Sequence, residues 1–163
     1  MNLVFDFAGV LFHWQPQALL GRLLPHRVRA LAEARHWVDA IFESYGGDWA
    51  EFDRGALAPD ALAQRIAART GLGVGEALAV IDAVARELQP VPEMVELLQR
   101  LDENGVPLFF LSNMPAPYAS ALEQHGFMRL FRQGIFSGRV GWIKPEREIF
   151  ALAAERFAIE PAR

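Results

Sequence analysis

The sequence predicts an α/β protein: a doubly wound parallel sheet with a bundle of helices inserted after its first strand. Residues 2–5 form a short, mostly apolar strand candidate, and residues 14–90 show helical patterns only. From residue 91 onward, helices alternate with short apolar strands, which is typical of βαβ units. We therefore expect an α/β unit made of residues 1–13 and 91–163, interrupted by a helical cap at residues 14–90.

The composition narrows the class of protein. The chain has 163 residues, of which 52% are hydrophobic and 22% charged, as in ordinary water-soluble globular proteins. Its net charge of −4 argues against nucleic acid or an anionic membrane as a general partner. The absence of cysteine excludes disulfides, thiolate zinc sites and a cysteine nucleophile. No apolar run approaches the length of a membrane span, so a cytoplasmic location is the default expectation.

Apolar residues at helical spacing predict the cap. The second of its helices should stop at Gly46-Gly47, and Pro59 occupies a first helical turn, where proline is tolerated. We expect a four-helix bundle with one apolar face per helix. Its helices should span residues 16–24, 29–45, 59–70 and 75–88, with a further turn of helix at 48–52.

The remaining elements alternate in type. Pro92 and Gly105 suit the first turn and the C-terminal cap of one helix. The acidic Glu146 and Glu148 suit the positive end of the last helix. We expect helices at residues 93–104, 117–125 and 145–157, and strands at 106–111 and 134–137.

Polar side chains stand where these strands end. Asp6 follows the first strand, Ser112 and Asn113 follow the second, and Lys144 precedes the final helix. The carboxyl ends of parallel strands meet at one edge of a sheet, so these residues should converge on one pocket. A carboxylate nucleophile beside hydroxyl, amide and ammonium donors suits attack on a phosphate group. Lys144 is the single lysine of the chain.

Three segments resemble motifs of the haloacid dehalogenase-like hydrolases, in the branch with a helical cap: residues 5–12 (FDFAGVLF), 108–113 (LFFLSN) and 138–150 (GRVGWIKPEREIF). The first is similar to bacterial phosphatases of the glucose-1-phosphatase type. The resemblance implies a magnesium-dependent hydrolase of small phosphate esters, such as sugar phosphates, that forms an aspartyl phosphate. It casts Asp6 as nucleophile and metal ligand, the carbonyl of Ala8 as a second metal ligand, Ser112 and Asn113 as phosphate ligands, and Lys144 as the charge-stabilising lysine.

The chain departs from this family in two places. Ala8 stands where most phosphatases of the family have a second Asp, which serves as general acid and base; His13 is the nearest titratable substitute. The fourth motif, paired carboxylates that complete the magnesium site, should follow shortly after residue 161, where the chain ends. The C-terminal strands would then be missing and the first strand would be an exposed edge, open to self-association, unless the chain is a truncated fragment.

Two further interpretations remain open. The chain can be a catalytically silent binding or assembly protein on the same scaffold, or a 2-haloacid dehalogenase-type hydrolase. The second needs an arginine from the early cap, for which Arg22 is a poor match. For the phosphatase function, the candidate pocket residues are Trp14, Trp49, Arg54 and Trp142.

Overall fold

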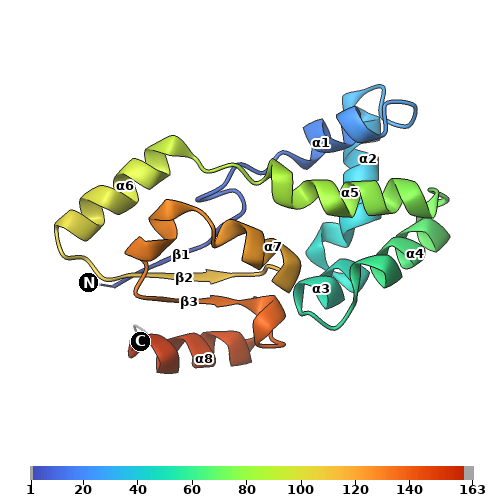
Figure 1. The fold of residues 1–163 in the computed structure, drawn as a ribbon. Coiled ribbons are helices and arrows are strands. Elements are labelled where there is room, and N and C mark those ends of the chain that lie inside the picture. Colours follow the sequence, from blue (N-terminus) through green and yellow to red (C-terminus); the bar gives the residue numbers. More distant parts are fainter. Residues whose placement is uncertain (1, 160–163) are drawn as a thin grey trace.

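The computed structural model describes residues 2–159, and its centre is a three-stranded parallel sheet (Figure 1). Strand β1 (Leu3–Phe5) pairs with β2 (Leu108–Ser112), which pairs in turn with β3 (Gln133–Phe136). All three strands run in the same direction, so their carboxyl ends share one edge. The predicted doubly wound parallel sheet is confirmed.

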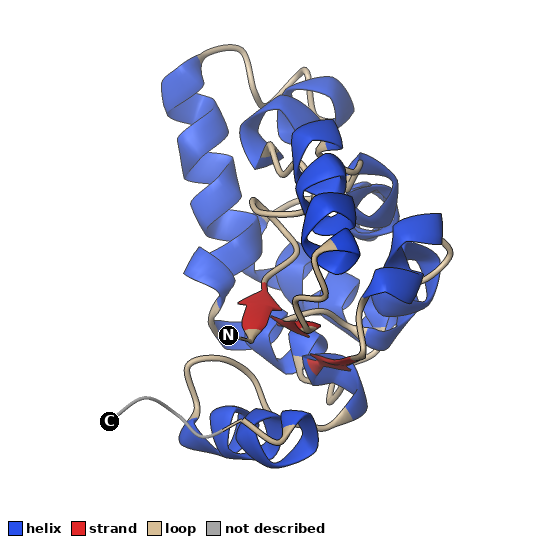
Figure 2. Cartoon of the chain, turned by 90° about the vertical axis from the view of Figure 1, so that its left-hand side faces the viewer, coloured by secondary structure: helices blue, strands red, loops and turns tan. Residues whose placement is uncertain are grey.

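The sheet lies between two layers of helices, as Figures 1 and 2 show. Strand β2 is buried along its whole length, and its side chains alternate between the two faces. Phe110 packs into the larger core with Phe7, and Phe109 packs into a smaller core that includes Phe157. Helix α8 (Arg147–Phe157) covers this second face, and α6 (Pro92–Glu103) and α7 (Ala116–Leu122) cover the first.

The regular elements between β1 and α6 are all helices, as predicted, but there are five α-helices instead of four. The predicted single turn at residues 48–52 is a helix of its own, because Trp49 and Phe52 bury their rings in the core. These helices lie together beyond the carboxyl edge of the sheet (Figure 1). They are α1 (Pro16–Leu23), α2 (Leu31–Phe42), α3 (Gly47–Asp53), α4 (Pro59–Thr70) and α5 (Val74–Glu87).

Some predicted boundaries were wrong by a few residues. Helix α2 stops at Phe42, before a 3₁₀ turn over Glu43–Tyr45, and helix α7 stops at Leu122. A second 3₁₀ segment, Gly126–Leu130, was not predicted. Helix α8 begins two residues later than predicted, because the carboxylate of Glu146 turns back to accept a hydrogen bond from the N–H of Ile143 (3.0 Å).

Strand β1 lies at the edge of the sheet: among residues 2–159 it pairs with β2 alone. The side chain of Val4 is 48% exposed, and that of Phe150 on the neighbouring helix α8 is 47% exposed. The segment after residue 161, where the fourth motif was expected, lies outside the described residues. Among the described helices, none combines the length and apolarity that crossing a bilayer requires.

Candidate active site

Asp6 and Lys144 form an ion pair at the carboxyl edge of the sheet. The ammonium nitrogen of Lys144 lies 2.6 Å from one carboxylate oxygen of Asp6. The other oxygen accepts a hydrogen bond from the backbone N–H of Phe7 (2.8 Å). Asp6 directly follows β1, and the adjacent Phe7 is fully buried, which fixes the backbone that carries the carboxylate. These contacts orient Asp6 and place a positive charge beside it.

Asn113 holds the backbone of Lys144. Its side-chain nitrogen donates to the carbonyl of Lys144 (2.9 Å), and its side-chain oxygen accepts from the N–H of the same residue (2.7 Å). The amide of Asn113 therefore bonds both backbone polar groups of a residue that lies 31 positions later in the chain. This arrangement anchors the loop that presents Lys144, and it uses the groups that the sequence assigned to phosphate binding.

Ser112 ends β2 with a hydroxyl that has no partner. The residue is 1% exposed, and within the described part of the chain its Oγ makes no hydrogen bond. A buried polar group without a partner is destabilising, and such groups often mark functional sites. Because Ser112 lines the same cavity as Asp6 and Lys144, its hydroxyl is free to donate to an anionic ligand there.

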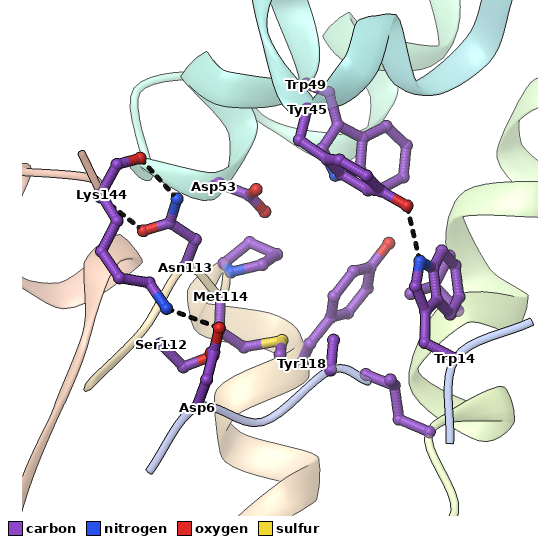
Figure 3. Close-up of a pocket in the computed structure, with 14 residues that line it drawn as sticks. Asp6, Trp14, Tyr45, Trp49, Asp53, Ser112, Asn113, Met114, Tyr118 and Lys144 are labelled. Atoms are coloured by element: carbon purple, nitrogen blue, oxygen red, sulfur yellow. Dashed lines mark hydrogen bonds and ion pairs between the residues drawn. The ribbon is translucent and has the colours of Figure 1, made fainter. Parts of the chain in front are cut away.

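These residues form the polar floor of a cavity of about 280 Å³ (Figure 3), at the small end of the range for ligand pockets. Its walls are mostly apolar or aromatic, and most of them come from the inserted helices and the turns beside them. The lining residues are Asp6, Ala8, Ser112, Asn113 and Lys144 at the sheet edge, with Trp14, Tyr45, Trp49, Asp53, Val84, Leu88, Met114, Pro115 and Tyr118 around them.

The aromatic wall consists of Trp14, Tyr45, Trp49 and Tyr118, and most of its polar atoms form hydrogen bonds with other groups. The ring of Trp49 makes edge contacts with Phe42 and Phe52. The indole nitrogen of Trp14 donates to the hydroxyl of Tyr45 (2.6 Å), and the hydroxyl of Tyr118 donates to a backbone carbonyl of α5 (2.7 Å). Burial raises the pKa of both phenols above their usual value. Near neutral pH the wall therefore presents uncharged aromatic surface.

Tyr45 reaches this wall through an unusual backbone. Glu43, Ser44 and Tyr45 all have positive φ values, of 49°, 52° and 62°. Residues other than glycine rarely adopt this left-handed region, and such strain tends to cluster at functional sites. The turn is held by the carboxylate of Glu43, which accepts a hydrogen bond from the N–H of Asp48 (2.9 Å).

Asp53, at the end of α3, is a buried carboxyl group that the sequence analysis missed. It is 6% exposed, and its side chain makes no hydrogen bond or ion pair within residues 2–159. Burial raises the pKa of Asp53 to about 7. Figure 3 shows its carboxyl group facing the cavity, between Asn113 and the aromatic wall.

The turn after Asp53 is fastened to the loop that carries Lys144. The hydroxyl of Ser137 donates to the carbonyl of Asp53 (2.6 Å), and Arg54 forms a two-bond ion pair with Glu146 (2.6 and 2.9 Å). Arg54 also donates to the carbonyl of Gly141 (3.1 Å). The guanidinium of Arg54 and the N–H of Ile143 lower the pKa of Glu146 to about 2, so this link stays charged at any physiological pH.

Four of the residues considered from the sequence lie away from the cavity lining. Arg54 forms the ion pair with Glu146 just described, and Trp142 is 43% exposed on the surface. His13 is exposed, and Arg22 pairs with Glu87 on the surface. The predicted Trp14 and Trp49 do line it.

The described residues offer part of a magnesium site. Asp6 supplies a carboxylate, and the carbonyl of Ala8 accepts no hydrogen bond from any described residue. Both are hard oxygen donors, and Mg²⁺ is commonly bound through one or two carboxylates together with phosphate oxygens and water. Within residues 2–159 no cluster of three or more His, Cys, Asp or Glu side chains is arranged to hold a metal. The donors fit magnesium in type and form an incomplete set.

Comparison with known proteins places this site in a family. A model of haloacid dehalogenase-like hydrolases matches residues 1–163. The sesquiterpene phosphatase astK of Aspergillus oryzae is 30% identical over 149 residues, which cover 90% of this chain and 69% of that protein. An L-2-haloacid dehalogenase crystal structure superposes with a TM-score of 0.70 at 25% identity, over 98% of this chain and 73% of that one.

A family enzyme from Bacteroides thetaiotaomicron, crystallised with magnesium and inorganic phosphate, has the same fold. Its TM-score is 0.69 at 20% identity, over 98% of this chain and 80% of that one. The match of the family model over the whole chain agrees with the parallel sheet and with the polar residues at its carboxyl edge. This chain is therefore a hydrolase that belongs to the haloacid dehalogenase-like family.

Proposed function

We propose that this protein hydrolyses phosphate monoesters through an aspartyl phosphate formed on Asp6. The observation that carries the proposal is the Ser112 hydroxyl, buried and unpartnered beside the Asp6–Lys144 pair. A phosphate ester brings several anionic oxygens that need donors. The Ser112 hydroxyl and the Lys144 ammonium supply them at the position where a carboxylate is oriented for attack.

Each residue at the sheet edge has its own role in the reaction. Asp6 attacks phosphorus as the bond to the alcohol oxygen breaks, and the resulting acyl phosphate is later opened by water. Lys144 neutralises charge on the carboxylate and on the transferring group, and the hydrogen bonds from Asn113 keep its backbone in place. Ser112 donates to a phosphate oxygen. The aromatic wall excludes bulk water, which strengthens each of these interactions.

Asp6 and the carbonyl of Ala8 would hold Mg²⁺. When bound, the ion supplies charge neutralisation to the phosphate oxygens. The family enzyme from Bacteroides thetaiotaomicron that was crystallised with magnesium and inorganic phosphate supports the choice of metal.

The cavity wall favours an apolar alcohol over a sugar. Each hydroxyl of a buried sugar needs a hydrogen-bond partner, because an unmade bond destabilises the complex by about 1–3 kcal/mol. Around this cavity the indole of Trp14 and the phenol of Tyr118 already donate to other groups. Apart from the carboxyl group of Asp53 and the hydroxyl of Tyr45, the remaining wall is aliphatic and aromatic. A phosphate ester of an isoprenoid or similar hydrocarbon alcohol fits this lining, and the similarity to a sesquiterpene phosphatase points to the same class.

The lining gives less support to a 2-haloacid dehalogenase. Such an enzyme must bind the substrate's carboxylate with a cation other than the one beside its nucleophile. Among the described residues, Lys144 is the one cationic side chain that lines the cavity, and it pairs with Asp6. The early-cap arginine, Arg22, points elsewhere and pairs with Glu87.

A substrate panel with magnesium tests the proposal. It contains a C15 isoprenoid monophosphate, glucose 1-phosphate, 2-chloropropionate and p-nitrophenyl phosphate. We expect kcat/KM to be highest for the isoprenoid ester, with no chloride released from the haloacid. Asp6→Asn should abolish turnover, and Asp39→Asn, an exposed aspartate of α2, should behave like wild type. Equal rates for wild type and Asp6→Asn would refute the proposal and favour a catalytically silent scaffold.

We also propose that the β1 edge pairs with a second copy of this chain. A two-fold axis brings the same edge of two molecules together in antiparallel register. The exposed Val4 and Phe150 would then bury their side chains. Sedimentation velocity should show a concentration-dependent dimer for wild type and a monomer for Val4→Lys. A wild-type monomer at all concentrations would contradict this.

A further inference from the structure

The phosphatase mechanism needs a proton donor that the sheet edge does not supply. A hydrocarbon alcohol is a poor leaving group unless its oxygen is protonated as the bond to phosphorus breaks. Ala8, in the position of the family's usual acid, has a methyl group that cannot transfer a proton. His13, the nearest titratable residue in sequence, is exposed and lies outside the cavity lining.

The cavity contains few alternatives. Besides Asp53, its titratable residues among those described are Asp6, Lys144, Tyr45 and Tyr118. Asp6 and Lys144 are paired with each other. The hydroxyl of Tyr118 already donates to a carbonyl, and burial makes both phenols weaker acids than usual.

We propose that Asp53, contributed by the helical insertion, is the general acid and base of this active site. It lines the same cavity as Asp6 and faces it from the opposite side (Figure 3). This inference rests on the proposed phosphatase function and assigns its missing proton carrier.

The position of Asp53 is fixed through its backbone. Its carbonyl accepts the hydrogen bond from Ser137, and the next residue, Arg54, is tied to Glu146 and Gly141. Ser137 is fully buried and also accepts from the N–H of Met114, two residues after Ser112 (2.8 Å). The carboxyl group is thus held in place relative to the sheet edge, although it comes from a different part of the chain.

The surroundings of Asp53 suit both protonation states. With no hydrogen-bond or ion-pair partner among residues 2–159, the buried carboxylate is poorly solvated, and its pKa of about 7 leaves both forms populated near neutrality. Burial of a carboxylic acid against aromatic rings is an established way to produce such an acid. Its neighbours Tyr45 and Tyr118 stay uncharged at this pH.

The proton moves twice in one cycle. In the first step, the bond from Asp6 to phosphorus forms and the phosphorus–alcohol bond breaks. The proton of Asp53 passes to the alcohol oxygen, which leaves as neutral alcohol. In the second step, the Asp53 carboxylate takes a proton from water as the water oxygen bonds to phosphorus. The Asp6–phosphorus bond breaks, which releases phosphate and restores the Asp6 carboxylate and the acid form of Asp53.

The test compares Asp53→Asn, which keeps the shape, with Asp53→Glu, which keeps the carboxyl group, and with the control Asp39→Asn. Each is assayed on the isoprenoid ester and on p-nitrophenyl phosphate, whose acidic phenol leaves without a proton. For Asp53→Asn we expect a loss of roughly 10²- to 10⁴-fold on the isoprenoid ester. Its first turnover of the aryl ester should remain within tenfold of wild type and appear as a burst, because the acyl phosphate then opens slowly. Asp53→Glu should recover part of the alkyl activity.

Three results separate the outcomes. An Asp53→Asn variant that hydrolyses the isoprenoid ester within threefold of wild type overturns the inference and leaves the phosphatase proposal standing. A loss of equal size on both esters, including the first turnover, overturns it in favour of a structural role. A wild type whose turnover does not depend on Asp6 overturns both proposals.

Discussion

Replacing Asp53 by Asn should raise the free energy of unfolding above that of wild type, and this gain should be larger at alkaline pH than at acidic pH. In the folded protein, burial raises the pKa of this carboxyl group from 3.8 to about 7. Folding therefore disfavours the ionised form. The penalty is absent below the unfolded pKa near 4, grows as the pH rises towards 7, and is constant above that. Wild type thus loses stability over this range, and Asn, which does not titrate, does not.

The size of this stability difference follows from the pKa shift of Asp53. One pKa unit corresponds to about 1.36 kcal/mol, so a shift of roughly three units corresponds to ~4 kcal/mol. Because Asp53 is only 6% exposed, solvent screens little of this. Between pH 5 and pH 8, where part of the penalty is already present at the lower pH, roughly 3 kcal/mol should appear. That is a large fraction of the 5–15 kcal/mol typical of a whole domain.

Urea unfolding of wild type and Asp53→Asn at both pH values measures this difference. The comparison at each pH cancels the other titrating groups, and the comparison between pH values cancels any fixed effect of the amide. Asp39→Asn, on the surface, should track wild type at both pH values. A change of less than about 0.5 kcal/mol between them, which is the usual range for a surface substitution, would show that the carboxyl group is hydrated and refute the reasoning.

Three further predictions concern the sheet edge, the Arg54–Glu146 ion pair and the core. Ser112→Ala removes an unpartnered hydroxyl, so the free energy of unfolding should not fall, whereas the inhibition constant of inorganic phosphate should rise about tenfold. Glu146→Gln should lose the stabilisation from the ion pair with Arg54. Because the pKa of Glu146 is lowered in the folded protein, that stabilisation is present above about pH 4.5 and disappears towards pH 2. The variant's loss of unfolding free energy, measured in urea, should therefore shrink as the pH falls. Gly134→Ala should destabilise by about 3 kcal/mol in the same assay, because its Cβ would lie 2.0 Å from the ring of Phe110; a loss under 0.5 kcal/mol would contradict this.

The residues at the carboxyl edge of the sheet were predictable from the order of strands and helices along the chain. Asp6, Ser112 and Lys144 each stand at the end of a strand or just before a helix, and parallel strands must bring such positions together. The structure places all three in one cavity, as expected. Asn113 also lines this cavity, but nothing in its sequence position indicates that its amide bonds the backbone N–H and carbonyl of Lys144, 31 residues away.

The wall of the cavity was less predictable, because the inserted helices pack through contacts that no short motif encodes. The sequence indicated Trp49 as a candidate pocket residue and a turn of helix at residues 48–52, but not that α3 would be a separate helix. The helical pattern also ran through Tyr45, whereas three consecutive left-handed residues end the helix and turn that ring to the cavity. Such backbone strain depends on tertiary contacts, here the ion pair of Glu43 with Arg69 of helix α4 (3.0 Å).

Asp53 owes its place to two glycines that are far apart in sequence. Gly55 has φ = 83°, and a Cβ there would lie 2.6 Å from the carbonyl oxygen of Gly138. A Cβ on Gly138 would in turn lie 2.6 Å from the backbone nitrogen of Ala116. Without a side chain, Gly55 lets the turn after α3 approach the segment after β3. Gly138 in turn lets that segment approach the backbone at the start of α7. The buried carboxyl group therefore depends on a backbone contact as much as on its own residue. Gly55→Ala should accordingly reduce isoprenoid-ester turnover more than aryl-ester turnover, as we expect for Asp53→Asn. An equal loss on both esters would refute this link.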